Sequence, residues 1–223
     1  MPSFGLITEG KTDQIVIGNI LSGYFNDPDI DVRPFLPLLD ETDKNRVENF
    51  SNWKLVLDYC KSPKFKEAFQ IIDYVIVQID TDTCEEPHYD ISKLEAGREL
   101  SPEELIEKVS EKLRNLIGKD FYDEYYQQII FAISVHEIEC WLLPLYYTDN
   151  KKEKFKGCLN TLNQELSKIE GFGISAANKN PDYYETISRK YLKHKVLMSK
   201  YADNPSFKIF IEEIEKREIE IED

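Results

Sequence analysis

Long apolar runs are absent from this 223-residue sequence. No stretch approaches the roughly 18 consecutive apolar residues that a helix needs to span a bilayer. The first residues also lack the basic segment and apolar stretch of a secretory signal. We therefore expect a cytoplasmic protein that has no membrane partner.

Cysteine is scarce and scattered. The four cysteines, Cys60, Cys84, Cys140 and Cys158, stand far apart in the chain and form no C-x-x-C pair. This spacing predicts neither a disulfide framework nor a zinc cluster. Reduced thiols in a cytosolic protein fit it best.

Basic residues are outnumbered by acidic ones, with 28 Lys and Arg against 42 Asp and Glu and a net charge of −14. Because affinity for nucleic acid comes largely from Lys and Arg that neutralise phosphates, a broad basic binding surface is excluded. Only residues 179–200 are locally basic. The acidic excess has two interpretations: a solvated surface that aids solubility, or a set of carboxylates that bind cations.

Strand-like and helix-like patterns alternate along the first two thirds of the chain. Apolar runs predict strands over residues 3–8, 31–39, 74–79 and 128–135, with helical patterns at 13–25, 49–59, from Ser101 onward and at 136–147. Pro34 and Pro37 confine the second run to a sheet edge or an irregular strand. The alternation predicts an α/β fold, with a mostly parallel, Rossmann-like sheet flanked by helices, over residues 1–148. Residues 149–223 show only helical patterns, notably at 159–169 and 207–219, and should form a helical extension that packs on the sheet.

Acidic residues stand at three of the predicted strand ends. They are Glu9 and Asp13 after the first strand, Asp80 and Asp82 at the strand over 74–79, and Glu137 and Glu139 after the strand over 128–135. The carboxyl ends of neighbouring parallel strands open on one crevice, where such folds bind ligands. Converging carboxylates repel one another unless cations lie between them, and their oxygens suit Mg²⁺ or Mn²⁺. The pattern therefore predicts a metal site.

Each of these acids taken alone is more often a helix cap or a turn former than a ligand. Asp80-Thr81-Asp82 is more specific, because alternate residues of an extended segment point the same way and can reach one ion. The combination of three strand ends strengthens the metal interpretation further.

Three short motifs resemble those of TOPRIM domains. Glu9-Gly10 with Asp13 is similar to the opening Glu-Gly motif, and Asp80-Thr-Asp82 is similar to the D-x-D motif. The segment around Glu137 resembles the third acidic motif of TOPRIM nucleases in overcoming-lysogenization-defect and RloB-like proteins. The resemblance covers roughly residues 3–147.

The resemblance implies a metal-dependent nuclease that cleaves DNA or RNA with two bound Mg²⁺ or Mn²⁺ ions. It implies that Glu9 and Asp13 bind one ion, that Glu9 also acts as general acid or base, and that the other predicted ligands are Asp80, Asp82 and Glu137 or Glu139. Two ions can clamp the attacking water and the leaving oxygen of a phosphodiester. A catalytic lysine is also expected beyond the acidic motifs.

The candidates for that lysine are Lys190, Lys193 and Lys195, with Lys193 assigned the catalytic role and the other two, with Lys11, assigned to substrate phosphates. RloB-like proteins imply defence against phage or mobile elements. The expected partners are nucleic acid, a separately encoded ATPase and a second copy of the chain.

Two other interpretations stay open. Gly5-x-x-x-x-Gly10-Lys11-Thr12 formally matches a phosphate-binding loop and would make the chain an NTPase, although a strand should precede Gly5 and only four residues do. The sparse basic surface is also compatible with a non-catalytic TOPRIM-like domain that binds a partner.

Overall fold

A computed structural model describes residues 1–37, 52–177 and 179–220 of the chain. Its centre is a four-stranded sheet made of β1 (Ser3–Ile7), β2 (Asp31–Leu36), β3 (Tyr74–Asp80) and β6 (Ile129–Ser134). The strand order is β2-β1-β3-β6, and every neighbouring pair is parallel. The predicted parallel α/β fold is confirmed. Pro34 lies in β2, which is an edge strand as predicted.

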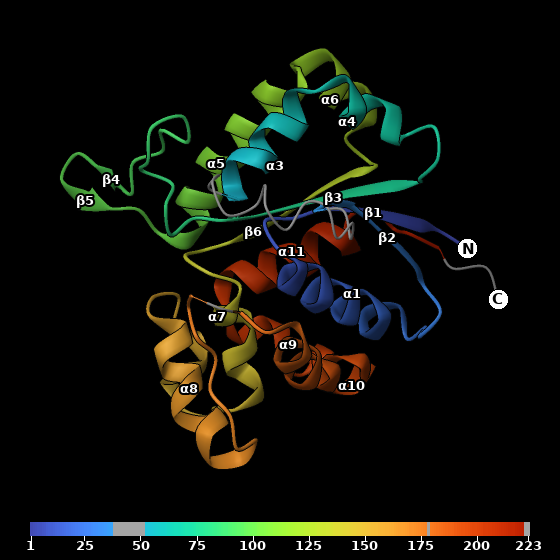
Figure 1. Cartoon of the computed structure of the whole chain (residues 1–223). Coiled ribbons are helices and arrows are strands. Elements are labelled where there is room, and N and C mark those ends of the chain that lie inside the picture. Colours follow the sequence, from blue (N-terminus) through green and yellow to red (C-terminus); the bar gives the residue numbers. More distant parts are fainter. Residues whose placement is uncertain (38–51, 178, 221–223) are drawn as a thin grey trace.

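Helices cover both faces of the sheet (Figure 1). On one face lie α1 (Lys11–Phe25) and α11 (Pro205–Glu215), and on the other lie α3 (Asn52–Lys61), α4 (Pro63–Ala68), α5 (Pro102–Ile117) and α6 (Lys119–Tyr125). Side chains alternate along β3, so that Ile76 joins the core on the α1 side and Val75 and Val77 join the core on the α5 side. Burial on both faces explains why β3 is almost wholly apolar.

Helix α5 begins where its sequence predicts. Ser101 accepts the backbone N–H of Glu104, the Glu104 side chain accepts the N–H of Ser101, and Pro102 occupies the first turn. Between β3 and α5 the chain also forms a short antiparallel hairpin that the sequence did not reveal, made of β4 (Leu94–Glu95) and β5 (Arg98–Glu99). Strands of two residues have too little pattern to be recognised.

After β6 the described chain consists of helices and 3-10 turns joined by loops. They are α7 (Glu139–Leu142), the 3-10 turns η2 (Leu143–Leu145) and η3 (Asn150–Glu153), α8 (Cys158–Ile169), α9 (Pro181–Ser188), η4 (Arg189–Leu192), α10 (His194–Met198), η5 (Tyr201–Asp203) and finally α11. Trp141 of α7 stacks on Phe207 and Phe210 of α11, with ring centroids 5.1 and 5.2 Å apart. The extension thus shares one hydrophobic core with α1 and the sheet.

One expected helix is shorter than predicted, and two expected elements extend beyond the described residues. A single amphipathic helix over 136–147 was expected, yet α7 has four residues and passes into η2. Pro144 has no N–H to continue an α-helix, which accounts for the change. Part of the strand expected over 31–39 and the start of the helix expected over 49–59 lie outside the described residues.

The cysteine prediction was wrong, because Cys140 and Cys158 form a disulfide with a Cα–Cα distance of 5.0 Å. The fold places the first residue of α8 against α7, and 17 intervening residues conceal this proximity in the sequence. Cys60 and Cys84 are free and buried. Among the described helices, none combines the length and the apolar character needed to cross a membrane.

Candidate metal centre

The carboxyl edge of the sheet has a switch point between β1 and β3. From β1 the chain passes to β2 on one side, whereas β3 lies on the other side. Such a point leaves a crevice beyond the strand ends. Glu9 follows β1 by two residues, Asp80 is the last residue of β3, and Asp13 lies in the first turn of α1. The structure therefore brings these three predicted residues to one crevice.

Hydrogen bonds across this crevice hold Glu9 and Asp80 together. The backbone N–H of Asp80 donates to Glu9 Oε1 at 2.7 Å. Gln78, buried in β3, accepts the N–H of Glu9 at 3.2 Å and donates to Asp80 Oδ1 at 2.9 Å. Sequence reasoning missed Gln78, although a polar residue inside an apolar strand was an available signal.

Asp13 is buried behind the turn that starts α1. A Cβ placed on Gly10 would lie 2.9 Å from Asp13 Oδ2, so the turn leaves the aspartate little space. Asp13 Oδ1 is buried and has no hydrogen-bond partner among the described residues. Burial raises the pKa of Asp13 to about 7, and Lys179 opposes the shift.

Glu139 enters the cluster from α7 and is fully buried. Its Oε1 atom lies 2.6 Å from Lys179 Nζ and also accepts a hydrogen bond from the Tyr184 hydroxyl. Its Oε2 atom is buried without a hydrogen-bond partner in the described part of the chain. Both partners of Oε1 come from the C-terminal extension.

Lys179 is the cation of the cluster, and it precedes α9. Burial lowers its pKa, but the charges of Glu139, Asp80 and Asp13 outweigh burial and raise the pKa above its ordinary value. Sequence reasoning missed Lys179 as a site residue, having noted it only as the start of the basic segment. No local pattern separates this lysine from its neighbours.

The positive charge of one lysine does not balance the negative charge around the remaining carboxylates. Burial raises the pKa of Glu9 to about 8; the hydrogen bond from the Asp80 N–H opposes this shift, and the charges of Asp13 and Asp82 add to it. Burial, followed by the charges of Glu9 and Asp13, raises the pKa of Asp80 well above its usual range. The cluster is therefore poised to take up either protons or further cations.

The donor set fits a divalent metal. Two buried carboxylate oxygens, Asp13 Oδ1 and Glu139 Oε2, lack hydrogen-bond partners among the described residues. Carboxylate oxygens are the ligands that Mg²⁺ and Mn²⁺ prefer. Glu9, Asp13, Asp80 and Glu139 are thus the residues that could hold metal.

Two predicted ligands lie at the margin of this cluster. Asp82 is exposed, and its backbone N–H donates to the carbonyl of His136 at 2.9 Å, although its charge reaches Glu9. The Glu137 carboxylate accepts the N–H of Leu159 at 2.8 Å, at the start of α8. Glu139 rather than Glu137 therefore faces Lys179.

Three of the four predicted lysines lie away from the cluster, and Lys11 lies beside it. Lys11 is exposed at the start of α1, and Lys190 pairs with Glu170 at 2.7 Å. Lys193 and Lys195 are exposed and flank His194, whose Nδ1 lies 2.9 Å from the carbonyl oxygen of Gly23. Gly23 is twelve residues along α1 from Lys11, about 18 Å at the helical rise. The lysine that contacts the carboxylates is therefore Lys179 and not Lys193, whose predicted catalytic role stays a prediction.

The phosphate-loop interpretation conflicts with the fold at Gly5. Gly5 lies inside β1, and a Cβ there would meet the ring of Phe35 at 2.4 Å. Because Gly5 has no side chain, the ring of Phe35 in β2 can pack against β1 at this position. A phosphate loop needs a flexible turn between its two glycines, whereas here Gly5 to Ile7 is strand.

Fold and site together define a parallel α/β protein with a carboxylate and lysine centre at the carboxyl edge of its sheet. No protein-family model, curated protein or solved structure matches the chain.

Proposed function

We propose that the chain is a divalent-metal-dependent nuclease of the TOPRIM type that hydrolyses phosphodiester bonds of DNA or RNA. The observation that carries the proposal is the convergence of Glu9, Asp13, Asp80 and Glu139 around Lys179. Structural ion pairs balance their charges, whereas this cluster sets three buried carboxylates and the half-buried Glu9 against one ammonium group. Functional sites are where such perturbed groups gather.

Each residue has a role that its position supports. Asp13, Asp80 and Glu139 are the metal-holding carboxylates. When bound, one or two Mg²⁺ or Mn²⁺ ions would polarise the phosphate and lower the pKa of a coordinated water. Glu9, with a pKa of about 8, can exchange a proton near neutral pH and suits the general acid or base.

Lys179 and Tyr184 act through Glu139. The ammonium group and the hydroxyl fix one oxygen of Glu139 and leave the other one for a cation. Lys179 also brings positive charge to the place where a phosphate would gain negative charge in the transition state. The helical extension is thus part of the proposed site.

The acidic surface bears on the partners of this enzyme. A chain at −14 binds free nucleic acid poorly unless another surface supplies cations. A second copy of the chain or a separately encoded ATPase would supply such a surface. Lys11, exposed at the start of α1 beside the crevice, is the residue we assign to substrate phosphate.

The test is cleavage of plasmid DNA and of RNA in the presence of Mg²⁺, Mn²⁺ or EDTA. We expect cleavage with metal, none with EDTA, and a loss on the order of 100-fold in Asp80→Asn, the scale of removing a group that stabilises transition-state charge. Asp29→Asn, an exposed aspartate in the turn after α1, is the matched control and should retain activity. Cleavage that persists in Asp80→Asn or in EDTA would refute the assignment.

The net charge favours one second candidate, a TOPRIM-like domain that binds a partner without catalysis. Under that alternative, Mn²⁺ still binds to the cluster in calorimetry while both nucleic acids stay intact. Metal binding by the cluster without cleavage of plasmid DNA or RNA would decide for this alternative.

A further inference from the structure

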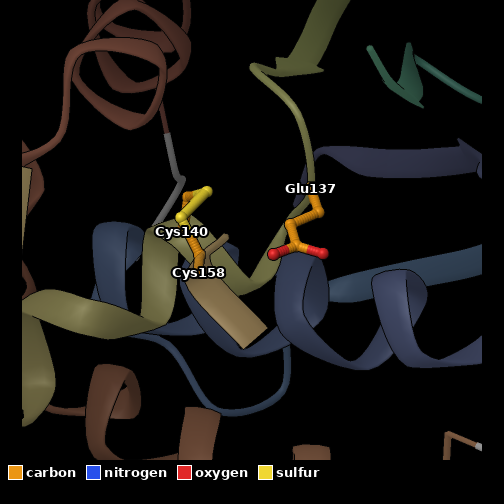
Figure 2. A group of neighbouring side chains, drawn as sticks. All are labelled: Glu137, Cys140 and Cys158. Carbon is orange, nitrogen blue, oxygen red and sulfur yellow. A yellow bond between two sulfur atoms is a disulfide. The ribbon is translucent and has the colours of Figure 1, made fainter. Parts of the chain in front are cut away.

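Two cysteines and one glutamate meet beside the carboxylate cluster, where α7 contacts the start of α8. Cys140 belongs to α7, Cys158 is the first residue of α8, and both are fully buried. Glu137 stands just before α7, with its carboxylate next to the two sulfur atoms (Figure 2). One ligand atom from each of the three residues lies within 4.8 Å of the others.

The start of α8 fixes the glutamate in this place. Gly157 precedes the helix and provides no side-chain cap. Glu137 Oε1 instead accepts the N–H of Leu159 at 2.8 Å. The N-terminus of a twelve-residue helix carries partial positive charge, which stabilises anions at this point. This partial positive charge would stabilise two thiolates and a carboxylate.

The donor set differs from that of the carboxylate cluster. Hard cations such as Mg²⁺ prefer oxygen ligands, whereas thiolates select thiophilic ions such as Zn²⁺. Zinc commonly takes three protein ligands and one water in a tetrahedral arrangement. Two sulfurs and one carboxylate oxygen meet that requirement without any residue of the neighbouring cluster.

We propose that the reduced chain binds a thiophilic divalent cation such as Zn²⁺ through Glu137, Cys140 and Cys158, and that the Cys140–Cys158 disulfide excludes this cation. The same two sulfur atoms serve both states. A disulfide has no thiolate to offer, so oxidation closes the site. This inference goes beyond the proposed nuclease function and does not depend on it.

The chemistry balances with a dithiol reductant. The reductant transfers two electrons and two protons, the Cys140–Cys158 bond breaks to give two thiols, and the reductant becomes a disulfide. Binding of the cation then releases the two thiol protons to solvent. Two buried thiolates and a half-buried carboxylate would be costly alone, and the divalent cation offsets two of these three charges.

The experiment compares the oxidised and reduced full-length chain. After dithiol treatment, the reductant is removed by gel filtration without oxygen, and thiols are counted in denaturant. The count should rise from two to four, because only Cys60 and Cys84 are free in the oxidised form. Cd²⁺ titration should then produce thiolate-to-metal charge-transfer absorption at one equivalent in the reduced chain alone. Zn²⁺ in large excess should displace Cd²⁺ and abolish the band.

Variants assign the ligands. Cys140→Ser and Cys158→Ser should lose the absorption, and Glu137→Gln should weaken Cd²⁺ binding about tenfold or more. Cys60→Ser, whose sulfur lies in the core on the other face of the sheet, is the matched control and should keep the band. Asp80→Asn should keep it too, since the carboxylate cluster is a separate site.

Three results would overturn the proposal. One is a fully reduced wild-type chain with four thiols that shows no charge-transfer band. Another is a thiol count that stays at two in excess reductant, because the site then never forms. The third is a band that survives loss of both Cys140 and Cys158. The wild-type comparison needs no substitution, so it decides the question even if a serine variant fails to fold.

Discussion

The two ends of α1 are both held by the C-terminal extension, but in opposite ways. At the N-terminal end, Asp13 faces Lys179, and carboxylate oxygens of Asp13 and Glu139 are buried without hydrogen-bond partners among the described residues. At the C-terminal end, Gly23 packs against the backbone of Tyr191, and His194 lies on the carbonyl oxygens of Gly23 and Tyr24. The polar atoms named at this end have hydrogen-bond partners.

This difference between the two ends of α1 distinguishes residues that serve function from residues that stabilise the fold. Close packing and satisfied hydrogen bonds stabilise a fold, whereas buried unbalanced charge destabilises it and persists where chemistry requires it. Substitutions at the Gly23 end should therefore lower stability and spare the metal site. Substitutions at the Asp13 end should change metal and pH responses as well.

The largest effect is expected for Gly23→Ala. The added Cβ would lie 1.8 Å from the Tyr191 carbonyl oxygen, so α1 and η4 must separate. We expect the free energy of unfolding in urea to fall by about 3 kcal/mol or more, the upper range for overpacking. Gly18→Ala in the same helix, where nothing lies within 4 Å of the new Cβ, is the control and should add about 0.5–1 kcal/mol. Equal effects of the two substitutions would contradict this account.

Lys179→Met should have the next largest effect. It removes the cation beside Glu139 while keeping an apolar stem, and we expect a loss of about 2 kcal/mol, less than for a fully buried pair because Lys179 is partly exposed. Mn²⁺ should then raise the Tm by more than in the wild type, since it replaces the missing charge. A double-mutant cycle with Glu139→Gln isolates the pair. Simple additivity of the two losses would show that Lys179 does not compensate Glu139.

The pH dependence of stability should be reversed from that of a paired carboxylate. Glu9 and Asp13 have folded pKa values of about 8 and about 7, above their unfolded values, so the folded chain binds more protons between pH 4 and pH 8. Stability then falls as pH rises through this window. We expect a Tm several degrees lower at pH 8 than at pH 5.5 without metal, and recovery with Mn²⁺.

Asp80→Asn is the control for the pH experiment. It removes one of the interacting charges and should flatten the dependence of Tm on pH. A Tm that rises from pH 5.5 to pH 8 in the metal-free wild type would show that these carboxyls are ionised at little cost in the folded state.

The smallest effect is expected for Lys193→Ala combined with Lys195→Ala. Both side chains are exposed at the far end of α1, where single surface substitutions change stability by no more than about 0.5 kcal/mol. Calorimetric Mn²⁺ affinity should equal that of the wild type. A large loss of Mn²⁺ affinity would place these lysines at the metal centre after all.

The parallel sheet and the acidic strand ends were predictable because their signals are local. β3 is a mostly apolar run, and α5 carries its capping box within four residues. Glu9 lies two residues after β1, and Asp80 is the last residue of β3. Parallel pairing then dictates that such ends meet at one edge of the sheet. The sequence alone thus determined the α/β fold class and three of the four carboxylates that now converge, with Glu139 paired ambiguously with Glu137.

Only the tertiary structure decided which lysine joins the carboxylates and which cysteines pair. Lys179 and Glu139 are 40 residues apart, and the helical segment between them carries no pattern that fixes where α9 docks on α1. Disulfide pairing has the same origin, because it depends on α8 folding back onto α7. The periodicity of a strand depends on neighbouring residues and can be recognised in the sequence. The docking of helices depends on side-chain packing over the whole core, and these contacts exist only in the folded chain.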